Sequence, residues 1–229
     1  MTISERATPL SALAGLFEGR VRIFESVVST IDECRALADA GADEGTVVIA
    51  QAQEHGRGQR GNAWSSPIGG LYLSALLRPP LPIETLTALP LVAGVAACEA
   101  LRDIFAIDAW IKRPNDILVP IDSRWRKVAG LLVDTAVQGG ELRHAIVSLG
   151  VNCRQSVGGF PPEIRDVATS LEALGCAADP DAVAAAFLTR LASWRARMDE
   201  SSAGWLADLE GRHAALVRDV VAGQAVGSP

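Results

Sequence analysis

The pattern of hydrophobic and polar positions predicts a chain with strands in the middle and helices early and late. Apolar runs rich in β-branched residues, bounded by glycine, proline or charged residues, predict the strands. These runs cover residues 21–28, 46–50, 71–78, 109–119, 126–134 and 143–152. The run at 109–119 contains a Pro-Asn-Asp turn and so predicts two short strands. Segments of helical length and periodicity cover residues 31–37, 86–105, 181–198 and 205–221.

Short connections between most of the strands favour antiparallel pairing. The predicted fold class is therefore α+β, with a mixed, largely antiparallel central β-sheet and flanking helices. The long helix at 86–105 is expected to bury an apolar stripe that includes Ile104 and Phe105. Pro90 interrupts its apolar run, which is too short to span a bilayer, so we expect a core helix.

Composition narrows the function classes. A hydrophobic fraction of 49% and a charged fraction of 21% are typical of a globular protein with a large core. The net charge of −6 argues against a general nucleic-acid binder, which normally shows a basic face. The N-terminus lacks a signal-peptide pattern, and the four cysteines are scattered without C-x-x-C spacing. We therefore expect a cytoplasmic protein that has free thiols and binds neither a membrane nor nucleic acid.

One polar stretch, Gln53–Trp64, follows a predicted strand and is called the glycine loop below. It contains three glycines within six positions, with Arg57 and Arg60 between them and Trp64 at its end. Such a loop combines a mobile backbone, free amide donors, two guanidinium groups and one flat apolar face. These groups suit a loop that closes over a small, partly apolar, anionic ligand.

The spacing of these glycines matches the dinucleotide fingerprint G-x-G-x-x-G, but its context does not. The fingerprint opens a helix, whereas residues 62–70 contain Ser-Ser-Pro and Gly-Gly. Prolines 79, 80 and 82 occupy the region where the fingerprint's acidic residue is expected. A P-loop is excluded because no Gly-Lys-Ser/Thr follows.

Further polar residues lie at the ends of apolar strands, where core packing does not explain them. Lys112, Asn115 and Asp116 surround the Pro-Asn-Asp turn, Lys127 begins one strand and Asn152 ends another. Taken singly, each is explained as a solvated lysine or a turn residue. Together with the glycine loop they predict a nucleotide site, in which cations neutralise phosphates and Asp116 holds magnesium or positions an amine.

Four ordered motifs resemble those of biotin protein ligases. They are Gly-Arg-Gly-x-Arg-Gly-x-x-Trp (56–64), Lys-x-Pro-Asn-Asp (112–116), Lys-Val-Ala-Gly-Leu-Leu-Val-Asp (127–134) and Leu-Gly-Val-Asn (149–152). Ala-Thr-Ser-Leu (168–171) fits as well, and the resemblance extends over residues 21–195. It implies a biotin/lipoate protein ligase-like catalytic domain that uses ATP and Mg²⁺ to convert biotin into biotinyl-5′-AMP. The biotinyl group is then transferred to a lysine on the carrier domain of a biotin-dependent carboxylase.

The resemblance also assigns residues by position. It implies that the catalytic residues are Lys127, Arg57 and Asp116, with Asp116 as the candidate metal ligand. The expected biotin contacts are Ser29, Thr30, Gln53, Gly56, Arg57, Gly58, Leu73, Ser74 and Lys127. The expected nucleotide contacts are Arg57, Gln59, Arg60, Trp64, Lys112, Asn115 and Asn152. Taken alone, Ser29 and Thr30 are explained as caps of the following helix.

The chain departs from the family pattern at three positions. Ile31 replaces an asparagine that offers biotin a polar contact, and Gln59 replaces an arginine that clamps the adenylate. Arg113 replaces a tryptophan, which is expected to remove an apolar group near the biotin pocket and add a charge.

The resemblance divides the chain into three parts. Residues 1–20 are expected to form an N-terminal extension, too short for a DNA-binding domain. Residues 21–198 are expected to form the catalytic domain. Residues 199–229 are expected to form a short helical tail, without room for a complete SH3-like barrel. Members of the family often dimerise, so a homodimer is a further expectation.

Two other functions remain open from the sequence. One is a lipoate- or octanoate-type protein ligase with the same adenylate chemistry, although the chain has no Arg-Arg-x-x-Gly-Gly-Gly loop. The other is a non-catalytic protein that binds biotin or biotinyl-AMP, which the altered clamp residue favours. The retained cations and the Asn115-Asp116 pair favour catalysis.

Overall fold

A computed structural model describes residues 9–13, 15–199 and 204–226 of the chain. Its centre is one seven-stranded sheet in the order β1-β2-β3-β7-β6-β5-β4. The strands are β1 Val21–Val27, β2 Val47–Gln53, β3 Leu71–Leu77, β4 Trp110–Lys112, β5 Asp116–Ile121, β6 Arg124–Gln138 and β7 Glu141–Val151. β1 and β2 are parallel, and all other neighbours are antiparallel. The predicted mixed, largely antiparallel sheet is confirmed.

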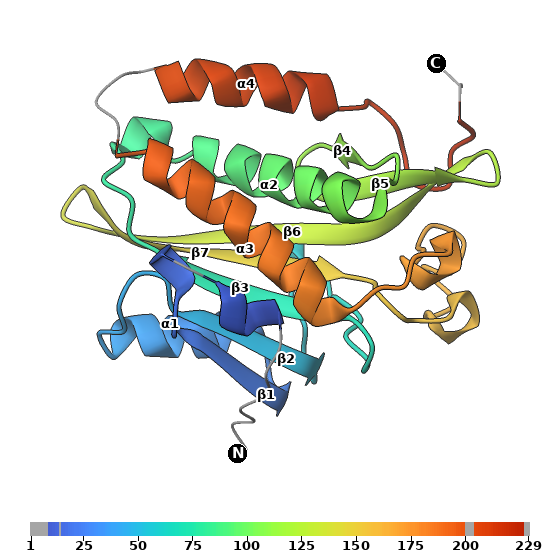
Figure 1. Cartoon of the computed structure of the whole chain (residues 1–229), viewed down its shortest axis with the longest axis horizontal. Helices are drawn as coiled ribbons and strands as arrows, with labels where there is room; N and C mark the ends of the chain where they lie inside the picture. Colours follow the sequence, from blue (N-terminus) through green and yellow to red (C-terminus); the bar gives the residue numbers. More distant parts are fainter. Residues whose placement is uncertain (1–8, 14, 200–203, 227–229) are drawn as a thin grey trace.

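Helices cover both faces of the sheet (Figure 1). They are α1 Thr30–Asp39, α2 Ala88–Phe105, α3 Pro180–Arg197 and α4 Gly204–Leu216. α2 and α3 pack on one face in the larger core, whereas α1 forms a smaller core on the other face. α4 packs on α2 as an outer layer. α2 is the predicted core helix, although in length and composition alone it would also pass as a membrane span.

The last helix ends at Leu216, five residues before the predicted end. The chain after it joins the sheet region instead of continuing the helix. The amide of Arg218 donates to the carbonyl of Ile111 at 2.9 Å, and the amide of Trp125 donates to the carbonyl of Gln224 at 2.9 Å. The first of these bonds satisfies the Arg218 amide, which a longer helix would have paired internally.

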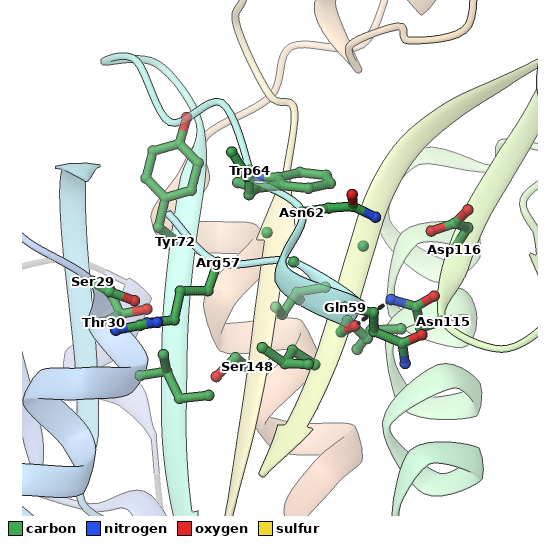
Figure 2. Close-up of a pocket in the computed structure, with 18 of the residues that line it drawn as sticks. Ser29, Thr30, Arg57, Gln59, Asn62, Trp64, Tyr72, Asn115, Asp116 and Ser148 are labelled. Atoms are coloured by element: carbon green, nitrogen blue, oxygen red, sulfur yellow. Dashed lines mark hydrogen bonds between the residues drawn. The ribbon is translucent and has the colours of Figure 1, made fainter. Parts of the chain in front are cut away.

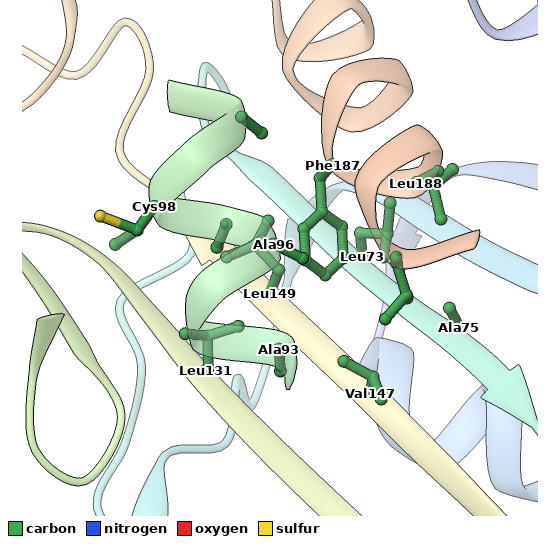
Figure 3. Packing of buried hydrophobic residues seen from close by; sticks show 14 of the residues in the cluster. Leu73, Ala75, Ala93, Ala96, Cys98, Leu131, Val147, Leu149, Phe187 and Leu188 are labelled. Carbon is green, nitrogen blue, oxygen red and sulfur yellow. The ribbon is translucent and has the colours of Figure 1, made fainter. Parts of the chain in front are cut away.

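The larger core is built by a strand and two helices that pack closely. Every residue of β3 is buried, and the facing side of α2 is rich in alanine, which lets α3 approach. Phe187 of α3 is fully buried in this cluster, which also contains Leu73 and Leu149 (Figure 3). This packing holds the strands whose ends form the site.

Replacing Phe187 with alanine should lower the free energy of unfolding by about 3–5 kcal/mol, because it leaves a cavity in this core. Ile104→Ala is the control, since Ile104 is 41% exposed and does not belong to the buried stripe predicted for it. Its cost should stay below about 1 kcal/mol. Urea unfolding of the two variants measures both values, and equal losses would contradict the packing described.

The sheet brings the polar strand ends to one edge. Leu71 at the start of β3 pairs with Val151 at the end of β7. Val151 also pairs with Ala129, near the start of β6. β2 ends at Gln53, where the glycine loop begins. Segments far apart in the chain therefore meet at this edge.

Candidate functional site

A cavity of about 290 Å³ opens at this edge of the sheet, and its wall contains most of the predicted site residues (Figure 2). The predicted residues that line it are Ser29, Thr30, Gln53, Arg57, Gly58, Gln59, Arg60, Trp64, Leu73, Lys112, Asn115, Asp116 and Lys127. Gly56 and Ser74 do not line it, but each is hydrogen-bonded to a lining residue, Gly56 to Trp64 and Ser74 to Thr30. Asn152 lines a second cavity of about 120 Å³.

Asp116 binds both lysines of the 229-residue chain. Its Oδ1 lies 2.6 Å from Lys127 Nζ, and its Oδ2 lies 2.9 Å from Lys112 Nζ. The Asp116 side chain is only 13% exposed, so the pairs are partly shielded from solvent. The three groups carry a net positive charge and suit an anionic ligand.

Asn115 orients this turn from the other side. Its Nδ2 donates to the carbonyl of Leu131 at 2.7 Å, and its own carbonyl accepts from the Leu131 amide at 2.9 Å. Both contacts tie the β4–β5 turn to β6. One of the two N–H groups of the Asn115 side chain is therefore used in positioning the turn.

The prediction that Asp116 is a metal ligand can be tested against the groups that surround its carboxylate. Both carboxylate oxygens already accept from lysines, and the described ranges contain no group of three His, Cys, Asp or Glu side chains arranged for a metal. Mg²⁺ commonly takes one or two carboxylates together with substrate phosphates and water. To contact a magnesium ion that arrives with a nucleotide, Asp116 would have to share its oxygens with the two lysines, so its assignment as a metal ligand stays a prediction.

At the other end of the cavity a buried polar cluster joins α1, β2, β3 and β7. The amide and Oγ1 of Thr30 donate to Gln53 Oε1 at 2.8 and 3.2 Å. Ser74 Oγ lies 2.9 Å from Thr30 Oγ1 and 2.8 Å from Ser148 Oγ. Such a network fixes donors and acceptors for the polar part of a ligand.

Helix capping does not explain Ser29. It occupies the N-cap position of α1, but its side chain makes no capping hydrogen bond. It is 2% exposed and lines the cavity beside Ile31. A hydroxyl that is buried and not used as a cap is available to a ligand.

The glycine loop folds into a small hairpin. Gly58 donates its amide to the carbonyl of Asn62 at 2.7 Å, and Trp64 donates to the carbonyl of Gly56 at 2.9 Å. Arg60 and Gly61 at its tip have positive φ values of 56° and 79°. A single 3₁₀ turn, Gln59–Gly61, replaces the helix that a dinucleotide fingerprint requires.

Trp64 lies directly on the backbone of two strands. Gly130 and Gly150 are cross-strand partners in β6 and β7. A Cβ at Gly130 would lie 2.8 Å from the indole, and one at Gly150 would lie 2.7 Å from it. Lys127 Nζ is 5.0 Å from the ring centroid, within cation–π range. The indole Nε1 lies over Gly150 and is buried without a hydrogen-bond partner in the described part of the chain.

Arg57 extends toward α1, where Ser29 and Thr30 begin the helix (Figure 2). Its Nε and Nη2 both donate to Oδ2 of Asp32, at 2.9 and 2.7 Å. Asp32 was not among the predicted site residues. Arg57, a predicted cation of the loop, is thus paired with a residue in the first turn of α1.

The second cavity adjoins the first, and the two share lining residues. Trp64 and Lys127 line both, and Asn152 lies in the second with Phe160 and Ala168. Asn152 Nδ2 donates to the carbonyl of Thr169 at 2.9 Å, which fixes its orientation. The site has two lobes with Lys127 between them.

Arg113 does not line either cavity. Its side chain is 61% exposed and pairs with Asp219 at 3.1 Å. The expectation that this departure adds a charge to the pocket is wrong, because the side chain turns outward to the segment after α4.

Sequence reasoning missed several lining residues. The principal ones are Asn62, Gly130, Ser148 and Gly150. A glycine inside a strand rich in β-branched residues indicates that another group packs closely on the backbone. Gly130 and Gly150 could therefore have indicated where Trp64 packs.

Cysteine chemistry does not belong to this site. Burial raises the pKa of Cys34, Cys98 and Cys153 to about 12, so these thiols are not nucleophiles at neutral pH. All four cysteines are free, as predicted. Burial also raises the pKa of Tyr72, whose hydroxyl donates to the carbonyl of Pro67 at 2.7 Å.

Residues 25–152, more than half of the chain, match the family described as Biotin/lipoate A/B protein ligase family. The chain belongs to this family. The bifunctional ligase/repressor BirA of Bacillus subtilis is 35% identical over 155 residues, covering 67% of this chain and 46% of that protein. The biotin–[acetyl-CoA-carboxylase] ligase of Mycobacterium tuberculosis is 32% identical over 178 residues, 73% of this chain and 62% of that one.

The fold of this chain is also similar to that of a biotin protein ligase whose structure has been solved. Biotin protein ligase from Aquifex aeolicus, in complex with biotin and ATP, has a TM-score of 0.71 and 31% identity. The match covers 87% of this chain and 78% of the other. The chain spans less than half the length of the BirA relative.

Adding a methyl group at Gly150 tests the seat of Trp64. Gly150→Ala should lower the free energy of unfolding by about 1–2 kcal/mol, because the new Cβ overlaps the indole. In a Trp64→Ala background the same change should cost less than about 0.5 kcal/mol, which is the coupling a double-mutant cycle measures. Gly158→Ala is the control, since nothing lies within 4 Å of its Cβ position. Equal costs in the two backgrounds would contradict the contact.

Proposed function

We propose that this protein is a biotin–[biotin carboxyl-carrier protein] ligase. It activates biotin with ATP to biotinyl-5′-AMP and transfers biotin to a lysine of a carboxylase carrier domain. The observation that carries this proposal is the two-lobed cavity in which Lys127 stands between the buried polar cluster and the lobe of Asn152. One lobe offers hydrogen-bonding groups to a small ring, and the other offers an amide to a base.

In the first step a carboxylate oxygen of biotin attacks the α-phosphorus of ATP, and pyrophosphate leaves. Both reactants are anions, so their approach requires nearby positive charge. Lys127 lines both lobes and is the cation proposed at the reacting centre, with Lys112 and Arg60 on the phosphates. Mg²⁺, when bound, would neutralise phosphate charge, and Asp116 is the residue proposed to contact it.

The other proposed contacts with biotin and the nucleotide are supported by the positions of the residues in and beside the two cavities. Ser29, Thr30, Gln53 and Ser74 belong to or adjoin the polar cluster proposed to hold the ureido ring, and Leu73 adds an apolar wall. Gly56, Arg57 and Gly58 bring the loop backbone to the carboxylate and phosphate. Gln59, Trp64, Asn115 and Asn152 complete the proposed nucleotide contacts.

In the second step the neutral amine of an acceptor lysine attacks the acyl carbon of the mixed anhydride. The carbon–oxygen bond to the phosphate breaks, AMP leaves and the amine nitrogen loses a proton. Asp116 is proposed to orient the amine, since it already accepts from two ammonium groups. The glycine loop, with Trp64 over the glycine pair, is proposed to exclude water from the anhydride.

The proposed partner is a biotin carboxyl carrier domain, and the proposed place is the cytoplasm, in keeping with the four free cysteines. We propose that residues 21–198 carry the activity. Residues 1–20 and 199–229 would be an extension and a tail, and assembly as a homodimer remains a proposal.

Lys127→Ala should lower biotin-dependent pyrophosphate release by roughly 100-fold or more, because it removes a charge at the reacting centre. Arg143→Ala, on the exposed start of β7, should leave the rate within about twofold. The assay is run with biotin and separately with lipoate, followed by mass analysis of a carrier domain. Release with lipoate alone would favour the lipoate-type ligase, and no product with either acid would leave only a binding protein.

Gln59→Arg should slow dissociation of biotinyl-AMP by roughly tenfold, because a guanidinium gives charge-assisted hydrogen bonds where the amide gives neutral ones. Gln59 lines the cavity, so a longer cationic side chain there faces the ligand. Gln138→Arg at the β6–β7 turn adds the same charge away from the site. A chase experiment measures the off-rates, and identical values for Gln59→Arg and the wild type would refute the role of this position.

A further inference from the structure

Arg57 connects the glycine loop to α1 through a single carboxylate. Asp32 Oδ2 accepts hydrogen bonds from both Nε and Nη2 of Arg57, so a single carboxylate oxygen binds two nitrogens of the guanidinium. The two residues are 25 positions apart in sequence. Arg57 lines the cavity, and Asp32 follows Ile31, another lining residue, in the first turn of α1. Their contact therefore ties the glycine loop to α1 beside the cavity.

Asp32 is itself held from behind. Its Oδ1 accepts from Arg35 Nη1 at 2.7 Å, and Arg35 donates to Asp134 Oδ2 at 2.6 and 3.2 Å. The chain of alternating charges runs from the loop through α1 to β6. Because Asp32 is already fixed, ordering Arg57 is the main entropic cost of closing this contact.

The pair is accessible to solvent, with side-chain exposures of 56% for Arg57 and 27% for Asp32. Exposed ion pairs contribute modestly and open readily. That strength suits a contact that closes over a bound intermediate and releases in every turnover. A fully buried pair would hold the loop shut.

We propose that Asp32 is a positioning residue that holds the glycine loop closed through Arg57. The loop then has two anchors on opposite sides of the cavity, Asp32 for Arg57 and the glycine pair for Trp64. With glutamine at position 59 supplying neutral contacts, the Arg57–Asp32 pair carries the charged part of loop closure. This inference rests on the proposed function for its ligand, and on geometry alone for the closed loop.

The first test measures dissociation of biotinyl-AMP from the wild type, Asp32→Asn and Asp134→Asn. Asp32→Asn should release the adenylate roughly three- to tenfold faster, because a neutral amide replaces the carboxylate under Arg57. Asp134→Asn makes the same chemical change one link further along the chain of charges and should stay within about twofold. Asp32→Glu should restore most of the retention.

A double-mutant cycle separates positioning from a general effect on α1. In an Arg57→Ala background, Asp32→Asn should change the off-rate by less than about twofold. An unchanged or slower off-rate for Asp32→Asn in the wild-type background would overturn the proposal. So would an equal acceleration with and without Arg57.

A second readout does not depend on the ligand. Amide hydrogen exchange of the ligand-free protein is compared for peptides that cover residues 54–64. In Asp32→Asn the amides of Gly58 and Trp64, which are hydrogen-bonded inside the loop, should exchange several-fold faster. If the wild type binds no biotinyl-AMP, the proposed function fails while this measurement still decides the role of Asp32. Equal exchange in the two proteins would refute it.

Discussion

The site depends on one carboxylate that two ammonium groups share. Asp116 stands at the start of β5, Lys112 ends β4 and Lys127 lies near the start of β6. Without the carboxylate the two cations would repel each other across the turn. With it, three strands end in one fixed, cationic group, and the register of β4, β5 and β6 places that group at the cavity wall.

The same edge of the sheet supplies a surface that an aromatic ring can cover. Two glycines pair across β6 and β7, so the backbone itself forms the floor beneath Trp64. A side chain at either position would raise the indole and widen the gap through which water enters. The small residues and the charged residues of the site thus have separate tasks: the former set how closely the loop approaches, and the latter set what it attracts.

Local patterns in the sequence predicted most of the fold, and the resemblance to the family predicted about half of the cavity wall. Strands and helices follow from periodicity, and the motifs around Arg57, Lys112 and Lys127 lie at strand ends where they meet in space. What could not be predicted depends on pairs of distant residues. The contact of Arg113 with Asp219 and the contact of Arg57 with Asp32 arise only when separate segments are packed together. The last helix ends early for the same reason, because Arg218 finds a backbone partner on β4.

Both lysines are bound to Asp116, and every other position in the Lys and Arg total of 21 is an arginine. A guanidinium stays protonated and does not act as an acyl acceptor at neutral pH. The side chains of this chain therefore present amines only inside the cavity, where each already donates to the same carboxylate. The protein's positive surface is inert toward an activated acyl group, and a lysine-directed label on this chain reports on the interior of its site.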